Sequence, residues 1–421
     1  MVLMLLFFFI SGAAIEHYKP LVGHETCATL ILGMCVSLIV YAIVEDEFQE
    51  VWKFNPQFFF YFLLPPIIFN SGFNMRKKRF FANLGNIMLF GLAVTLVCFT
   101  LYTTISIVVL DKLPMKAFNY MRQNQPDTYT TEESEFDIKS AVSGMQIALL
   151  CALLCSSDVV AAVSIVSYKE QPKLYSCVFG EGVFNDIVSI ILYGTVSGFL
   201  TASFKWYTPF EIFGEFILLW IISIAIGVFV GFGTSFLFKH AKFLTVNAVT
   251  ETFLMFALGL TGYFIAEMIV IAGNPMSGVM ALLTCSIIDS HYTWYNLSPQ
   301  GKSTSTVTIA FMGTFCEASV YSYVGIALYS SIPTWWSFTF IGVFFAIVVV
   351  FRIISIFSVF YLGRCCCRRK TISFRELIFI SYAGMIRGAI AFALVLEIPY
   401  CAYDDFDSHP ICTCVNDGSC L

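Results

Sequence analysis

One carboxylate lies deep in a run of Ile, Val and Leu, where it could bind an ion. On a helix Glu181 and Asn185 lie four residues apart and share a face, as do Gly182 and Asp186. Gly182 has no side chain, so it leaves space beside the Asp186 carboxylate for a small cation and water. Burial disfavours the charged form of a carboxylate, so near neutral pH Asp186 could exchange a proton for a cation.

The residues around this carboxylate favour a monovalent cation. A hard carboxylate beside the Asn185 amide and backbone carbonyls suits Na⁺ or K⁺ better than a transition metal. No His or Cys cluster has the spacing of metal ligands, and no nucleotide-binding or hydrolase motif is present. We therefore expect Asp186 to bind Na⁺ or K⁺, with no cofactor and no enzymatic reaction.

Two other apolar stretches are interrupted by polar residues. One contains Ser157 and Asp158, and the other contains Arg387 between Gly384 and Gly388. Unwound helices of transporters expose half-helix ends to ions at such breaks. An Asp near positive helix ends and an Arg near negative ones would compensate the helix dipoles. We expect Asp158, Ser157 and Arg387 to belong to the ion site.

The other ionisable residues within apolar stretches are few. Each costs from a few to many kcal/mol in lipid unless it is paired or hydrated. For Glu267 and Glu317 an interfacial or structural ion pair is an alternative to a role in transport. These remaining residues are Glu181, Glu267, Glu317 and Arg352.

The composition identifies the environment in which these charges act. The 421-residue chain is 58% hydrophobic, 17% aromatic and only 12% charged, about half the charge of a soluble domain. The apolar runs are continuous, whereas barrel strands would alternate apolar and polar residues. The sequence therefore predicts an all-α, multi-pass membrane protein, and it gives no sign of a nucleic-acid partner.

Twelve segments are long and apolar enough to be candidate spans. Most of the 23 Lys and Arg residues lie in links after odd-numbered segments, so the positive-inside rule predicts a luminal or extracellular N-terminus. The segments are 1–16, 24–44, 56–74, 86–110, 141–167, 176–200, 211–238, 250–272, 275–290, 307–331, 335–363 and 377–398.

The two interrupted segments, 141–167 and 377–398, occupy matching places if two six-helix inverted repeats are joined by segment 211–238. That arrangement requires a thirteenth span, so we expect the last span to lie beyond residue 421. Residues 399–421 would then form a luminal Cys-rich loop, whose four cysteines could form two disulfides or stay as free thiols. These cysteines are Cys401, Cys412, Cys414 and Cys420.

Several motifs resemble the monovalent cation/proton antiporters, in the eukaryotic Na⁺/H⁺ exchanger branch. They are residues 63–69 (LLPPIIF), residues 179–186 (FGEGVFND) and residues 386–393 (IRGAIAFA). The stretches HYT at 291–293 and NLSP at 296–299 look most like organellar, endosomal and plant vacuolar exchangers. The resemblance covers about residues 16–400, and three motifs on three separate segments make it specific.

The resemblance implies a homodimer in which a mobile core domain carries an ion site past a rigid dimer domain. Asp186 would carry the cation and the proton, with Asn185 beside it, while Glu181 would pair with Arg352 as a structural link. Asn-Asp in place of Asp-Asp implies electroneutral, one-for-one exchange. The approximate parts are 1–74 for dimer-domain helices, 86–200 for the core, 211–290 for the linker and dimer domain, and 307–398 for the core, all within one exchanger domain, 1–421.

The sequence also departs from this family. The triplet Ser157-Asp158-Val159 stands where the family usually has Thr-Asp-Pro, and Gly182 replaces a common Ser ligand. A transport-inactive homologue that serves as a structural membrane subunit is therefore an alternative, and a cation channel is another. We expect Na⁺, K⁺ and H⁺ as substrates, membrane lipid as surroundings, and an organelle membrane rather than the plasma membrane.

Overall fold

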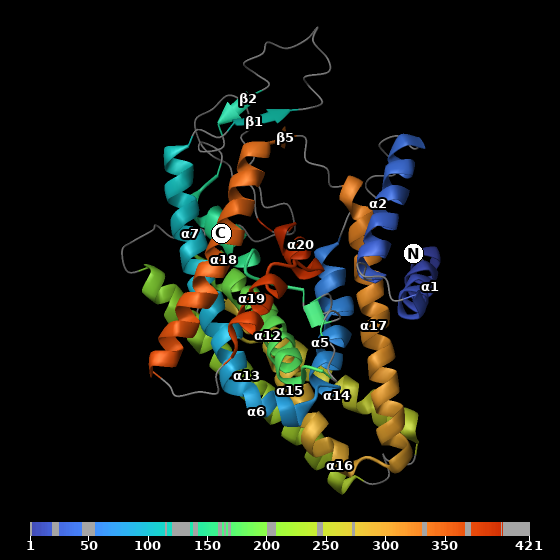
Figure 1. The fold of residues 1–421 in the computed structure, drawn as a ribbon. Coiled ribbons are helices and arrows are strands. Elements are labelled where there is room, and N and C mark those ends of the chain that lie inside the picture. The colour runs from blue at the N-terminus through green and yellow to red at the C-terminus, as the bar shows by residue number, and fades with distance from the viewer. Residues whose placement is uncertain are drawn as a thin grey trace.

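The computed structural model is a bundle of helices with short strands in the links (Figure 1). It describes residues 2–18, 25–43, 55–113, 116–119, 135–137, 142–158, 162–163, 166, 170–199, 208–241, 247–271, 274–330, 335–366, 372–396 and 398. The Cys-rich stretch 399–421 lies outside the described residues.

The N-terminal part holds α1 (Val2–Tyr18), α2 (Glu25–Ile43), α4 (Pro56–Phe58), η1 (Phe59–Leu63), α5 (Leu64–Phe73), α6 (Lys77–Met88), η2 (Leu89–Val94), α7 (Thr95–Lys112), β1 (Lys116–Asn119), β2 (Glu135–Asp137), α10 (Gly144–Leu153) and α12 (Pro172–Gly198). The second part holds α13 (Thr208–His240), α14 (Ala248–Met268), β3 (Val270–Ile271), β4 (Asn274–Pro275), α15 (Gly278–Ile288), η5 (Asp289–Thr293), α16 (Trp294–Asn296), α17 (Pro299–Ser330), β5 (Trp335–Trp336), α18 (Phe338–Cys366), α19 (Phe374–Ala383) and α20 (Ala389–Val395).

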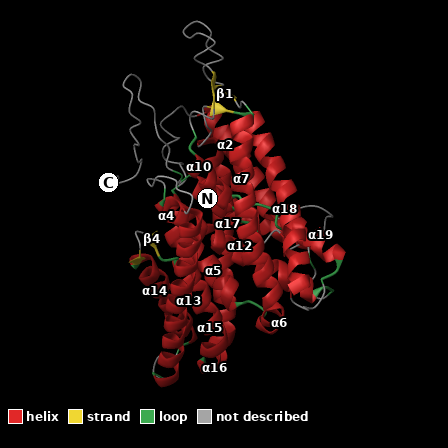
Figure 2. Ribbon diagram, turned by 90° about the vertical axis from the view of Figure 1, so that its left-hand side faces the viewer, coloured by secondary structure: helices red, strands yellow, loops and turns green. Residues whose placement is uncertain are grey.

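Six helices among the described residues are long and apolar enough to cross a membrane, and α1, α2 and α10 are shorter apolar helices. The predicted multi-pass helical architecture is confirmed. Figure 2 shows the long helices side by side, with β1 at one end of the bundle and α16 at the other. The small sheets, β2-β1-β5 and β3-β4, were not predicted.

Helix ends differ most from the prediction where a helix continues into charged sequence. Lys77 to Arg79, which the prediction placed in a link, form the first turn of α6, and Lys302 lies inside α17. The reason is that hydropathy marks only the apolar part of a helix. Backbone hydrogen bonds extend a helix into water as readily as into lipid.

A π-helical turn precedes the two prolines of α5. Pro65 and Pro66 have no backbone N–H to donate, so a regular helix would lose bonds at this point. The wider turn η1 precedes them, and the N–H of Leu64 bonds to the carbonyl of Phe59. The helix therefore continues through the prolines from residue 56 to residue 73.

The buried apolar side chains form clusters on two sides of α12. One large cluster joins α12 to α5, α13, α14, α15 and α17. Another joins α12 to α7, α10, α18 and α19. Figure 1 shows α17 beside α2 and α5, at some distance from α7 and α18. The α2 and α17 backbones meet at Gly33 and Gly325, where a Cβ on Gly33 would lie 2.9 Å from the Gly325 Cα.

Candidate ion site at two crossed helix breaks

Two helices break at the centre of the molecule, and the breaks touch. The segment after α10 leaves the helix at residues 154–158, and the segment after α19 does so at residues 384–388. The N–H of Asp158 donates to the carbonyl of Ile386 at 2.8 Å. Arg387 Nη1 donates to the carbonyl of Ser156. One backbone hydrogen bond and one guanidinium hydrogen bond therefore join the two breaks.

Each break is preceded by a short helix that begins with a serine capping box. Ser143 caps α10 and Ser373 caps α19, each through a capping box with the residue three positions later. Both helices have ten residues. The caps fix where each helix begins. Because the two helices have equal length, each break starts at the same distance from its capping serine.

Asn185 connects the first break to α12. Its side-chain Nδ2 donates to Ser157 Oγ and to Glu181 Oε1, both at 3.2 Å. Its Oδ1 accepts from the hydroxyl of Thr95 on α7. Asn185 is fully buried, and all of its polar atoms are engaged. We infer that its contacts hold the neighbouring Asp186 at the break.

Asp186 faces a cavity of about 80 Å³. The backbone amide of Ser157 donates a hydrogen bond to the Asp186 carboxylate. The cavity is lined by Ser157, Asp158 and Gly388 from the two breaks, and by Glu317 and Tyr321 from α17. Since one water needs about 10–15 Å³ of such space, the cavity can hold a small cation and a few waters.

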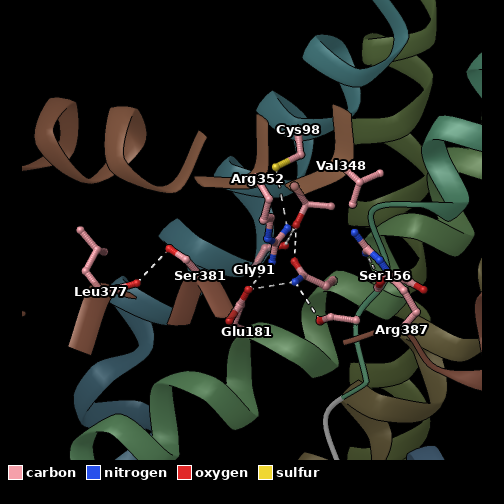
Figure 3. A network of polar contacts seen from close by, with 12 residues as sticks. Gly91, Cys98, Ser156, Glu181, Val348, Arg352, Leu377, Ser381 and Arg387 are labelled. Atoms are coloured by element: carbon pink, nitrogen blue, oxygen red, sulfur yellow. Dashed lines mark hydrogen bonds and ion pairs between the residues drawn. The ribbon is translucent and has the colours of Figure 1, made fainter. Parts of the chain in front are cut away.

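A buried ion pair lies directly beside this cavity. Arg352 Nη2 on α18 bonds to Glu181 Oε1 on α12, and both side chains are almost fully buried (Figure 3). Arg352 Nη1 also contacts Cys98 Sγ at 3.8 Å. Breaking a buried pair by removing one partner costs about 3–5 kcal/mol, so this pair ties α12 firmly to α18.

Gly384 gives Arg352 the room that it needs. A Cβ at Gly384 would lie 2.3 Å from Arg352 Nη2. The first residue of the second break therefore covers the Arg352 guanidinium with its backbone. Gly388, at the other end of this break, faces Asp158 at ordinary contact distance, 3.5 Å between the two Cβ positions.

The structure brings together the residues selected from the sequence. Ser157, Asp158 and Asp186 line one cavity, and Asn185 links Ser157 to Glu181, the partner of Arg352. Arg387 does not line this cavity but contacts the first break through the Ser156 carbonyl. Glu267 has a different role. Its Oε1 accepts from the N–H of Gly278 at 3.0 Å, so it caps the start of α15.

The sequence did not predict the roles of several polar residues inside and outside this cavity. Tyr321 donates to Asp158 Oδ2, and Thr95 donates to Asn185. Glu251 and Asp289 are fully buried carboxylates outside the cavity. Glu251 accepts from Ser298 at the start of α17, and Asp289 accepts from Thr293. The signal for Tyr321 was its position four residues after Glu317, which puts both on one face of a helix.

Comparison with known proteins agrees with this architecture. Residues 4–401 match the family model described as "Sodium/hydrogen exchanger, transmembrane". The chain is 27% identical over 380 residues to sodium/hydrogen exchanger 1 of Oryza sativa subsp. japonica, covering 88% of this chain and 66% of that protein. It is 29% identical over 391 residues to sodium/hydrogen exchanger 8 of Gallus gallus, covering 91% and 62%. The chain thus spans slightly less than two thirds of the length of these relatives.

Solved structures show the same fold. The structure of the sodium proton antiporter MjNhaP1 from Methanocaldococcus jannaschii at pH 8 matches with a TM-score of 0.61 at 16% identity, over 93% of this chain and 83% of that one. A second structure of that antiporter gives a TM-score of 0.63. The matched family model covers all of the residues that build the two crossed breaks. The chain belongs to the sodium/hydrogen exchanger family.

Proposed function

We propose that this protein exchanges Na⁺ or K⁺ for H⁺ across a membrane, one for one, with Asp186 carrying the cation and the proton in turn. The observation that carries the proposal is the placement of Asp186 in a small buried cavity at the crossing of two helix breaks. Relatives named sodium/hydrogen exchangers support the reaction class.

On α12, the ion pair of Glu181 leaves Asp186 as the carboxylate that can carry an ion. Arg352 neutralises Glu181, so this carboxylate is committed to a structural bond. Among the described residues no Lys or Arg forms an ion pair with Asp186. A carboxylate in that position needs a counterion, either a proton or a metal cation. Competition between the two ions for one carboxylate couples their fluxes.

Alternating access would move this cavity between the two sides of the membrane. We propose that α6, α7, α10, α12, α18, α19 and α20 form the moving core. Of these helices, α7, α10, α12, α18 and α19 build the breaks and the cluster around Arg352, α6 packs on α12, and α20 follows the second break. In this proposal α17 belongs to the other part together with α1, α2, α4, α5 and α13–α16, because it packs on α2, α5 and α14. This differs from the sequence-based division, which placed 307–331 in the core.

Three further properties are proposed from the family and the sequence. They are a homodimer, a luminal or extracellular N-terminus, and an organelle membrane. Membrane lipid surrounds the bundle, which exposes large apolar side chains such as Phe229 on α13 and Phe345 on α18. K⁺ remains part of the proposal beside Na⁺, because the carboxylate and hydroxyl oxygens on one part of the cavity lining can bind either ion.

The test is reconstitution of the purified protein into vesicles with an imposed Na⁺ or K⁺ gradient and an internal pH dye. Asp186→Asn removes the titrating group while keeping its size, so we expect cation-driven proton flux to fall at least about a hundredfold. Asp289→Asn is the control, because Asp289 is a fully buried carboxylate that lies outside the cavity. This variant should retain wild-type flux.

The same vesicles test the stoichiometry. One-for-one exchange moves no net charge, so an imposed membrane potential should leave the initial rate unchanged. An Asp186→Asn protein with wild-type flux would refute the role of Asp186. A wild-type protein without any cation-driven proton flux would favour a structural subunit, and single-channel currents would favour a channel.

A further inference from the structure

The α17 helix contributes a hydroxyl group to the ion site. Tyr321 donates its O–H to Asp158 Oδ2, a bond between residues 163 positions apart in the chain. Glu317 lies one helical turn before Tyr321, and both side chains line the cavity that contains Asp186. Asp158, Glu317 and Asp186 are the carboxylates that line this cavity together with Tyr321.

This bond joins the two proposed parts of the molecule. Asp158 is held from the core side, where its N–H bonds to the carbonyl of Ile386 in the second break. Tyr321 is held from the other side, because α17 packs along α2 and α5. The backbone of Asp158 is therefore fixed by one part, and an oxygen of its side chain is fixed by the other.

We propose that Tyr321 is a positioning residue for the cation site, which orients the Asp158 carboxylate beside Asp186 and closes the cavity against α17. This inference rests on the exchange function proposed above. A tyrosine at this place supplies what a purely apolar helix face cannot, a donor for a carboxylate that is only 8% exposed. Without the donor, the Asp158 carboxylate loses the contact that fixes its orientation, and it turns toward water or the cation.

The α17 helix offers a matched control. Tyr323 lies two residues further on, and its hydroxyl accepts the N–H of Asn55 at 2.7 Å, away from the cavity. Tyr321→Phe and Tyr323→Phe each remove one oxygen and keep the ring. Both changes should leave folding intact, so a difference between them reports on the cavity.

The first measurement is exchange by vesicles at a series of Na⁺ concentrations. Tyr321→Phe should raise the KM for Na⁺ about tenfold, as expected for loss of a hydrogen bond to a charged group, and leave Vmax within about twofold. Tyr323→Phe should leave both parameters unchanged. A structural defect would lower Vmax through loss of working protein and leave KM unaltered, and that result would overturn the inference.

The second measurement needs no transport. Na⁺ binding stabilises the folded protein, so the shift of the thermal unfolding midpoint with Na⁺ gives a binding curve for purified protein. Tyr321→Phe and Asp158→Asn should each weaken Na⁺ binding, and the double variant should be no weaker than Asp158→Asn alone. Full additivity of the two changes would show that Tyr321 does not act through Asp158.

These results separate the two proposals. If wild-type protein exchanges cations, Asp186→Asn does not, and Tyr321→Phe keeps the wild-type KM, only the role of Tyr321 fails. If Asp186→Asn exchanges like wild type, the proposed function itself fails.

Discussion

The break after α10 and the break after α19 are built alike up to the residue where each helix stops. Both helices start at a serine capping box, both have ten residues, and both end in a turn followed by three residues without regular secondary structure. Counting from the two serines, Ser157 matches Arg387 and Asp158 matches Gly388. The first break thus has a serine followed by an aspartate, and the second has an arginine followed by a glycine.

The difference shows how two similar helix breaks can combine to form one site. Arg387 reaches across to the Ser156 carbonyl of the first break, and Asp158 sits against Gly388 of the second. Two acids or two bases at these matched places would repel each other in a region where water cannot screen them. The framework fixes the crossing, and the unequal residues supply opposite charges to it.

The strongest way to break this complementarity is to remove the base. Arg387→Ala deletes the bond to the Ser156 carbonyl, so we expect exchange in vesicles to fall by about ten- to a hundredfold. Arg387→Lys keeps the charge and should recover part of the rate. Arg375→Ala, at an exposed position on α19, is the control and should behave as wild type. Wild-type exchange by Arg387→Ala would show that the guanidinium bond between the breaks is dispensable.

The two glycines of the second break should respond very differently to alanine. Gly384→Ala places a methyl group 2.3 Å from Arg352 Nη2 and forces the guanidinium away from Glu181. We expect a loss of up to about 3–5 kcal/mol, measured as a lower thermal unfolding midpoint in detergent. At Gly388 the new Cβ meets Asp158 at 3.5 Å, so Gly388→Ala should be close to wild type in stability.

Equal destabilisation by the two alanines would contradict this account. It would mean that any side chain in the break disturbs the crossing, whatever lies opposite it. The comparison therefore separates the need for room beside Arg352 from the general flexibility of glycine.

The sequence predicted the parts of this arrangement that depend on local pattern. Apolar runs located the helices, and polar residues within those runs located both breaks. The four-residue spacing of Glu181 and Asn185 predicted a shared face, and the two side chains do touch, at 3.2 Å. These features follow from helix geometry alone, so they need no knowledge of neighbouring segments.

What the sequence could not give is the set of contacts between distant segments. Tyr321 and Thr95 look like ordinary residues of apolar helices, because a single hydroxyl changes neither hydropathy nor periodicity. Their roles appear only when α17 is placed against the first break and α7 against α12. The pairing of Glu181 with Arg352 was predicted only from the family resemblance, because local pattern cannot connect residues that are 171 positions apart.

The smallest expected effects concern the capping boxes of α10 and α19. Ser143→Ala and Ser373→Ala each remove one cap, and each should lower stability by about 0.5–2 kcal/mol. The third residue differs, because it is Gln146 in one box and Glu376 in the other. Only Glu376 adds a negative charge near a helix N-terminus, and it also lies 3.7 Å from Lys173 on α12.

Glu376→Gln keeps a capping acceptor but removes this charge, so it should cost only about 0.3–1 kcal/mol. Salt should abolish most of that loss, because the ion pair with Lys173 is partly exposed and screened. Ser373→Ala should keep its effect at high salt, since it removes a local hydrogen bond. Thermal unfolding of both variants at low and high NaCl measures the two contributions, and a salt-independent effect of Glu376→Gln would assign that stability to the cap geometry.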